Sequence, residues 1–139
     1  MAVPPGRFQV VNWQGRTIIL DPAHTPAAAA ALRRDVLALG HSKPVWIVAM
    51  LRGRAPAPFL SGLASSDEDL LVTQTESSRS VETALLQHEA GPRPHVVPFS
   101  SPVSALEWAV DATPMDSPIV ITGSVELVAR MREALQVVY

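Results

Sequence analysis

The sequence contains no cysteine among its 139 residues. This excludes disulfides, thiol catalysis and zinc sites built on thiolates, and it leaves the redox compartment undetermined. Lysine is nearly absent as well, since Lys43 stands against ten arginines, and the formal net charge is -2. A chain with so little net charge has no basic field for a polyanion, so we expect no nucleic-acid partner.

Long hydrophobic runs are also missing. The longest clean apolar run covers residues 45–51, far fewer than the roughly 20 residues that a membrane-spanning helix needs. The N-terminus lacks a charged segment followed by an apolar one, which a secretion signal would show. We therefore expect a soluble protein of the cytoplasm with no membrane contact.

What the sequence does contain is typical of a packed globular protein. Apolar residues make up 47% of it and charged residues 17%, which excludes a disordered tail. The length fits one domain over residues 1–139. The 13 prolines are about twice the usual share of roughly 5%, and most of them fall between the elements predicted below.

Apolar spacing alternates between that of strands and that of helices. Two β-rich runs, 8–12 and 17–20, are separated by a turn-sized gap that contains Gly15, which predicts an opening hairpin. Helical spacing then predicts helices over 26–40, 59–64, 81–85, 103–110 and 128–138, and short apolar runs predict strands over 45–49, 70–73, 95–97 and 119–121. Strands alternating with helices imply parallel pairing through right-handed crossovers. The expected fold is therefore α/β and Rossmann-like, with three layers: a mostly parallel sheet of about six strands with an N-terminal antiparallel hairpin, and helices on both faces.

The segment Asp-Pro-Ala-His-Thr-Pro at residues 21–26 lies between a predicted strand and a predicted helix. Ligands of open α/β sheets bind at such carboxyl ends of strands. Two interpretations stay open. Thr25 could cap the helix with Pro26 in its first turn and Asp21 holding the loop. Alternatively, Asp21 and His24 face a ligand together beside a helix N-terminus that favours anions, where a carboxylate suits a ribose diol.

Other polar residues give weaker signals. Arg52 and Arg54 follow the predicted strand over 45–49 and could meet phosphate or remain solvated. Glu76 and Arg79 could pair on the surface. Ser124, in the Thr-Gly-Ser segment 122–124, is suited to cap the last helix.

Several motifs are absent. His41, His88 and His95 show no metal-ligand spacing, and we assign them no role. There is neither GxxxxGK[ST] nor GxGxxG, so the chain cannot by itself hold a triphosphate or dinucleotide in the usual ways. The lack of GxSxG argues against an α/β-hydrolase.

Four segments together resemble a known family: Pro-Gly-Arg-Phe at 5–8, residues 19–26, Ala-Met-Leu-Arg at 49–52, and Ile-Thr-Gly-Ser at 121–124 with a following Leu-Val. In order and spacing they resemble the C-terminal domain of folylpolyglutamate synthase/dihydrofolate synthase, a branch of the Mur ligase superfamily. The likeness extends from about residue 4 to residue 135. The aspartate-x-alanine-histidine-x-proline element is common to the superfamily, whereas the opening Pro-Gly-Arg and the closing Thr-Gly-Ser indicate the folate branch over the peptidoglycan branch.

The resemblance implies an ATP-dependent amide ligase, which activates a carboxylate as an acyl phosphate that the amine of glutamate attacks. It implies that Asp21 holds the ribose hydroxyls of ATP and that His24 lies near the nucleotide and its phosphates. Arg7, in an interdomain linker formed by residues 1–7, would reach the phosphates when the domains close. Closure would keep water from the acyl phosphate.

The same resemblance places other parts of the reaction outside this chain. The P-loop, the Mg ligands and most of the folate site would lie in a central domain, so no residue of this chain is expected to be catalytic by itself and the chain alone is expected to be inactive. Glutamate would be held largely by this domain, with Arg52, Arg79 and Ser124 as possible substrate or closure contacts. We expect a monomer.

The chain also departs from the family pattern. Pro22 stands where glycine is usual and Thr25 where asparagine is usual, and residues 53–55, Gly-Arg-Ala, stand where the family commonly has Asp-Lys-Asp. These departures keep two alternatives open. One is a stand-alone, non-catalytic domain that binds a nucleotide or a partner protein. The other is the C-terminal domain of a peptidoglycan Mur ligase, which should lack the Thr-Gly-Ser ending. The gene upstream of Met1 would separate the first from a ligase.

Overall fold

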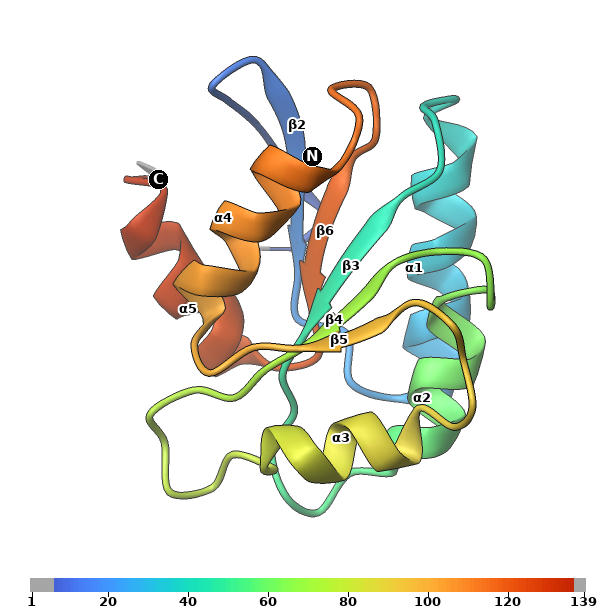
Figure 1. Cartoon of the computed structure of the whole chain (residues 1–139), viewed down its shortest axis with the longest axis vertical. Coiled ribbons are helices and arrows are strands. Elements are labelled where there is room, and N and C mark those ends of the chain that lie inside the picture. The colour runs from blue at the N-terminus through green and yellow to red at the C-terminus, as the bar shows by residue number, and fades with distance from the viewer. Residues whose placement is uncertain (1–6, 137–139) are drawn as a thin grey trace.

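The computed structural model describes residues 7–136, so residues 1–6 of the expected linker lie outside the described part of the chain. Its centre is a six-stranded sheet with the order β1-β2-β6-β3-β4-β5 (Figure 1). The strands are β1 (Gln9–Trp13), β2 (Arg16–Asp21), β3 (Val45–Val48), β4 (Leu70–Val72), β5 (Val96–Pro98) and β6 (Ile119–Thr122). β1 pairs antiparallel with β2, and all other neighbours pair parallel.

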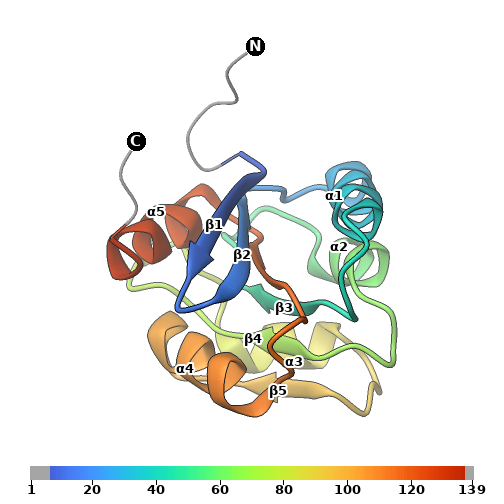
Figure 2. The same ribbon diagram turned by 90° about the horizontal axis from the view of Figure 1, so that it is seen from above.

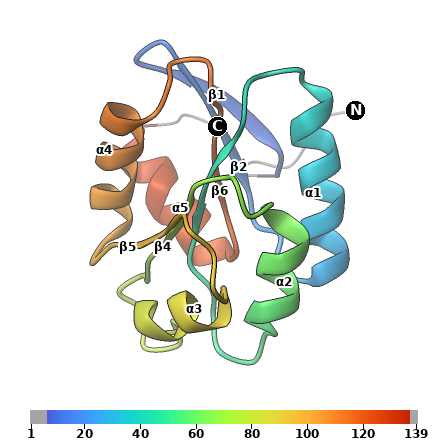
Figure 3. The same cartoon turned by 45° about the vertical axis from the view of Figure 1, so that its right-hand side comes forward.

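Five helices cover the two faces of this sheet (Figures 2 and 3). They are α1 (Pro26–Ala38), α2 (Pro56–Leu63), α3 (Thr83–Glu89), α4 (Pro102–Ala112) and α5 (Val125–Ala134). Buried residues of α1, α2 and α3 share one apolar core with the sheet, and those of α4 and α5 share the other. The predicted α/β fold with a hairpin and helices on both faces is therefore confirmed.

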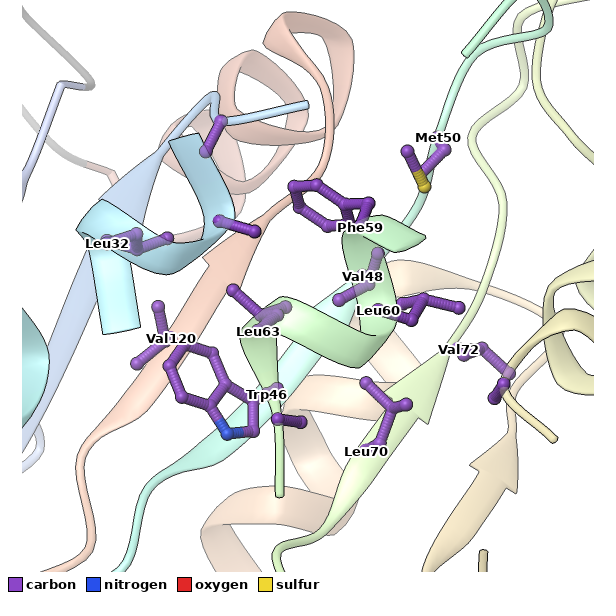
Figure 4. Packing of buried hydrophobic residues seen from close by; sticks show 14 of the residues in the cluster. Leu32, Trp46, Val48, Met50, Phe59, Leu60, Leu63, Leu70, Val72 and Val120 are labelled. Carbon is purple, nitrogen blue, oxygen red and sulfur yellow. The ribbon is translucent and has the colours of Figure 1, made fainter. Parts of the chain in front are cut away.

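The central strands are apolar throughout because both of their faces are covered. In β3 all four residues are buried, with Trp46 and Val48 on the side of α1 and α2, and Val45 and Ile47 on the side of α4 and α5. Figure 4 shows the first of these cores, where Trp46 lies beside Leu63 and Val120. The buried central strands β3, β4 and β6 hold the loops at the carboxyl edge of the sheet in place.

The predicted boundaries differ from the observed ones at several points. α1 ends at Ala38 rather than at Gly40, and α2 begins at Pro56, three residues before the expected start, because proline fits a first helical turn that needs no amide. In α3 the buried residue is Leu86, whereas Leu85, which belonged to the expected apolar face, is 48% exposed. Between residues 7 and 136, no helix has the length and apolar character to cross a membrane.

Candidate functional site

Three loops that are far apart in the sequence meet at the carboxyl edge of the sheet. The central strand β6 pairs with β2 on one side and with β3 on the other, so that Thr122 lies opposite both Asp21 and Val48. The Thr122 hydroxyl also donates to the Ala23 carbonyl over 3.3 Å. The parallel pairing therefore brings together the segments 21–26, 49–55 and 122–124.

A cavity of about 440 Å³ opens between α1 and the N-terminal segment, here residues 7–8. It is lined by Arg7, Phe8, Asp21 and His24 together with residues along one side of α1 that include Ala28, Ala31, Leu32 and Asp35. The three residues that the sequence assigned to a nucleotide therefore lie around one cavity. It combines a carboxylate, an imidazole and a guanidinium with an apolar wall, as small-molecule sites commonly do.

Asp21 already has partners at both carboxylate oxygens. Oδ1 accepts the Ala23 amide over 2.9 Å and Oδ2 accepts the Phe8 amide over 2.9 Å. The carboxylate thus holds its own loop, as one of the two interpretations expected, and it also holds the N-terminal segment. Because a carboxylate accepts hydrogen bonds, a ligand that binds to Asp21 must offer donors such as hydroxyl groups.

The backbone at Phe8 is in the left-handed region, with φ 41°. This conformation costs an ordinary L-residue roughly 1–2 kcal/mol, whereas a hydrogen bond to a charged group contributes about 1.5–3 kcal/mol. The two effects are similar in size, so the bond to Asp21 only just offsets the strain. The Phe8 ring is half-buried and packs against the same core as α1.

His24 is oriented by its own loop. Its Nδ1 lies 3.0 Å from the Pro22 carbonyl oxygen, and because a carbonyl can only accept, Nδ1 must carry the proton. In the neutral ring this leaves Nε2 as an acceptor. His24 also borders a second, small cavity of about 60 Å³, which is lined by Arg54, Gly123, Ser124 and neighbouring residues.

The helices α1 and α5, which begin beside His24 and Gly123, both have side-chain caps. The Thr25 hydroxyl accepts the Ala28 amide over 3.2 Å at the start of α1, where Pro26 occupies the first turn. The Ser124 hydroxyl accepts the Leu127 amide over 3.1 Å at the start of α5, and Ser124 is only 3% exposed. Both residues therefore have the capping role that their types predict, and a substrate contact by Ser124 stays a prediction.

Arg52 and Arg79, treated separately in the sequence, are neighbours in the fold. The Arg52 amide donates to the Arg79 carbonyl over 2.8 Å, next to an isolated bridge between Leu51 and Ser80. The Arg52 guanidinium donates to the Ser78 carbonyl. Arg79 is exposed. Over residues 7–136 no ion pair joins it to Glu76, so the expected surface pair is not formed.

Arg52 borders a further cavity of about 390 Å³, together with Gln74, Ser77, Ser78, Ser80, Val81, Glu82 and Leu85. The Gln74 side-chain carbonyl accepts both the amide and the hydroxyl of Thr83, at 2.9 and 3.0 Å, and so holds the start of α3. Sequence reasoning missed Gln74 and Glu82 here. The one available signal was the Ser/Thr-rich loop that follows β4.

No metal site is formed by the part of the chain that the structure describes. Within residues 7–136, no three His, Asp or Glu side chains gather closely enough to hold an ion. Any metal that accompanies a nucleotide at this edge would need ligands beyond these side chains.

Comparison with known proteins identifies the family of this chain. Residues 6–125 match the family model described as Mur ligase, glutamate ligase domain. Over 80 residues, 56% of the chain, the sequence is 31% identical to the UDP-N-acetylmuramoyl-L-alanyl-D-glutamate--2,6-diaminopimelate ligase of Aquifex aeolicus, of which it covers 17%.

Solved structures match nearly the whole chain. Bifunctional folylpolyglutamate synthase/dihydrofolate synthase from Yersinia pestis, complexed with AMPPNP and Mn ion, superposes with a TM-score of 0.83 at 28% identity. The match covers 98% of this chain and 32% of that one. A structure of such a synthase with Mn, AMPPNP and L-glutamate bound gives the same TM-score at 29% identity, with 98% and 32% covered. The chain therefore spans about a third of these enzymes.

Proposed function

The chain belongs to the family of Mur ligase glutamate ligase domains, and from this premise we propose that it forms part of an ATP-dependent ligase that joins glutamate to a folate-type acid. The observation that carries the proposal is the cavity at the carboxyl edge of the sheet. Asp21, His24 and Arg7 come from two separate segments and surround it. In the proposed enzyme this domain closes over the nucleotide.

Each of these residues has a role that fits its geometry. The Asp21 carboxylate accepts the ribose hydroxyls. His24, with Nδ1 held by Pro22, presents Nε2 to the nucleotide, and the Arg7 guanidinium approaches the phosphates. ATP supplies the phosphoryl group that converts the acid to an acyl phosphate, and the glutamate amine then displaces phosphate to form the amide. Closure of the domain excludes water from that intermediate.

The cavity beside Arg52 is the proposed place for glutamate. A guanidinium matches a carboxylate in charge and shape, and Ser77, Ser78 and Ser80 add hydroxyl groups around it. A similar synthase has been solved with L-glutamate bound, which supports glutamate as the amino acid that the proposed enzyme joins. The Arg52 amide is hydrogen-bonded to the Arg79 carbonyl, and this bond links the two loops so that Arg79 moves with Arg52.

The triphosphate cradle and the Mg ligands are proposed to lie in a P-loop domain beyond this chain. Residues 7–136 offer no cluster of metal ligands, and the sequence has no P-loop motif. We therefore assign no metal-dependent step to these residues. The purified 139-residue chain should show no ATP-dependent addition of glutamate, and turnover by the chain alone would contradict this division.

The proposal is tested by placing this chain in a complete enzyme. In a chimera, the chain replaces the matching 32% of the Yersinia pestis synthase, and glutamate addition to folate-type acids is measured with and without ATP. We expect ATP-dependent activity. In that chimera His24→Ala should lower kcat/KM for ATP roughly 2- to 10-fold, because the hydrogen bond that Nε2 accepts from the nucleotide is lost.

His88→Ala is the matched control, since His88 is exposed on α3 and borders none of the three cavities. It should leave kcat/KM unchanged. A folded chimera that binds ADP and yet adds no glutamate would contradict the ligase proposal and favour a non-catalytic binding domain. Such a domain is the alternative suggested by Gly-Arg-Ala at residues 53–55.

A second candidate, a peptidoglycan-type ligase, is favoured by the 31% identity to the diaminopimelate-adding enzyme of Aquifex aeolicus. The amino acid bound beside Arg52 distinguishes the two. L-glutamate and 2,6-diaminopimelate are titrated separately into the 139-residue chain, and the amide resonances of Arg52, Ser77 and Ser78 are followed by NMR. The folate-type proposal expects the response from glutamate, and a response from diaminopimelate alone would favour the second candidate.

A further inference from the structure

The contact between Asp21 Oδ2 and the Phe8 amide joins the proposed nucleotide site to the segment through which the chain enters the domain. We propose that this contact is exchanged on binding: a ligand with vicinal hydroxyls, such as the ribose of a nucleotide, takes the place of the Phe8 amide on Asp21 and lets the Phe8 backbone relax, which redirects Arg7. The inference rests on the proposed function and adds to it a means by which occupancy of the cavity sets the direction of Arg7.

The two hydrogen bonds of Asp21 differ in how easily a ligand can replace them. The Ala23 amide belongs to the same loop, two residues away, and Ala23 is 7% exposed. The Phe8 amide comes from 13 residues away, and both Phe8 and Arg7 border the cavity. Ala23 borders the cavity as well, but its amide is held to Asp21 within one short loop, so the bond from the more distant Phe8 is the one that a hydroxyl replaces.

The left-handed conformation of Phe8 depends on the hydrogen bond to Asp21. Within residues 7–136 three residues other than glycine have positive φ: Phe8, Gln14 and Gln136. Gln14 belongs with Gly15 to the two-residue turn of the β1–β2 hairpin, and Gln136 directly follows the C-cap of α5, where this conformation is routine. Phe8 lies in neither setting. Among the residues that the structure describes, Asp21 is the partner that holds the Phe8 amide in this conformation.

Release of the amide does not require the segment to unfold. The Phe8 ring packs against the core shared with α1, and β1 begins at the next residue. The ring and strand thus keep their places while rotation about the Phe8 backbone changes the direction of the preceding residue, Arg7. Because the bond to Asp21 offsets the strain of the positive φ at Phe8, a ligand that replaces the amide on Asp21 favours the relaxed backbone.

The test uses the 139-residue chain and two nucleotides, ADP and 2′,3′-dideoxy-ADP, which lacks the hydroxyls. Backbone amide shifts and hydrogen-exchange rates are measured by NMR at up to about 10 mM nucleotide, enough to detect Kd values in the millimolar range. We expect ADP to raise the exchange rate of the Phe8 amide by about tenfold or more while the Ala23 amide stays protected. The dideoxy nucleotide should leave the Phe8 amide unchanged.

Two aspartate variants serve as a matched pair. Asp21→Asn should give fast Phe8 amide exchange without nucleotide and no further response to ADP. Asp111→Asn, at an exposed position of α4 outside this cavity, should leave Phe8 exchange as in the parent chain. Because the nucleotide comparison uses the unmodified chain, it remains decisive even if Asp21→Asn fails to fold.

The other outcomes separate this inference from the proposed function. If ADP shifts the amides of His24 and Ala28 saturably while the Phe8 amide keeps its shift and rate, nucleotide binding stands and the exchange is overturned. If both nucleotides release Phe8 equally, hydroxyl exchange is overturned. If neither nucleotide causes a saturable shift, nucleotide binding by this chain fails, and the exchange fails with it.

Discussion

Replacing Glu68 with alanine should lower the free energy of unfolding by about 3–5 kcal/mol, as the loss of one partner of a buried ion pair does. Glu68 is 5% exposed. Its carboxylate accepts both Arg33 guanidinium nitrogens, at 2.7 and 3.1 Å, the Trp46 indole N–H at 2.9 Å and the Ser65 amide at 2.9 Å. Alanine would leave the Trp46 N–H buried without an acceptor, inside the core shown in Figure 4.

Urea unfolding of the two proteins at neutral pH measures this effect. Glu107→Ala, at an exposed position of α4, is the matched control and should change the free energy of unfolding by less than about 0.5 kcal/mol. Equal effects of the two substitutions would show that the Glu68 network contributes no more than a surface residue.

The Glu68 carboxylate should also make the stability of the protein depend on pH. Burial by itself would raise the pKa of Glu68, but the hydrogen bonds from Arg33, Ser65 and Trp46 outweigh it and hold the pKa below its ordinary value of 4.5. The folded state therefore favours the ionised form, and the stabilisation is present in full well above pH 4.5. It is lost as the pH falls below 4.5 toward the lower pKa of the folded state. The difference in stability between the parent chain and Glu68→Gln should shrink over that range.

Gly123→Ala should destabilise the domain by about 2–6 kcal/mol, because backbone strain and overpacking act together. Gly123 has φ 112°, and a Cβ there would lie 2.4 Å from the Ala49 carbonyl oxygen and 3.0 Å from Val48 Cγ1. The carbonyl belongs to the backbone and cannot turn aside like a flexible side chain. Alanine would therefore push the end of β6 away from the end of β3, at the edge that forms the site.

Gly53→Ala separates the two causes. Gly53 also has positive φ, 93°, but a Cβ there would meet nothing within 4 Å. Thermal or urea unfolding of Gly53→Ala should show the cost of strain alone, about 1–3 kcal/mol, and Gly123→Ala should lose clearly more. If both lost the same stability, the close approach to Ala49 would carry no cost, and the glycine of Thr-Gly-Ser would be needed only for its φ.

Local patterns in the sequence were sufficient for most of the fold. Alternating strand and helix spacing predicted the element order, the hairpin and the parallel sheet, because burial on two faces imposes continuous apolar runs on strands and stripes on helices. Thr25, Pro26 and Ser124 were recognised as helix-start residues because capping depends on neighbours within a few positions. The resemblance to Mur ligase domains placed Asp21, His24 and Arg7 at one site, and the structure sets them around one cavity.

These local patterns could not predict contacts between distant parts of the chain. Arg16 was taken as part of a turn, yet it is fully buried and donates to the Val110 and Thr113 carbonyls at the end of α4, over 3.0 and 3.2 Å. The pairing of the Arg52 and Arg79 loops arises because β3 and β4 are adjacent strands whose ends meet at one edge. The spacing of apolar residues does not show which strands become neighbours in the sheet.

The sequence by itself therefore determined the α/β class, the caps of α1 and α5 and the family of this protein, since each depends on residue types at short and regular spacing. Only the tertiary structure decided that Asp21 holds Phe8 in a left-handed conformation at the rim of the cavity, and that Gly123 must approach the backbone of Ala49. Both depend on the relative positions of strands in the folded sheet, where residues distant in sequence come within a few ångströms.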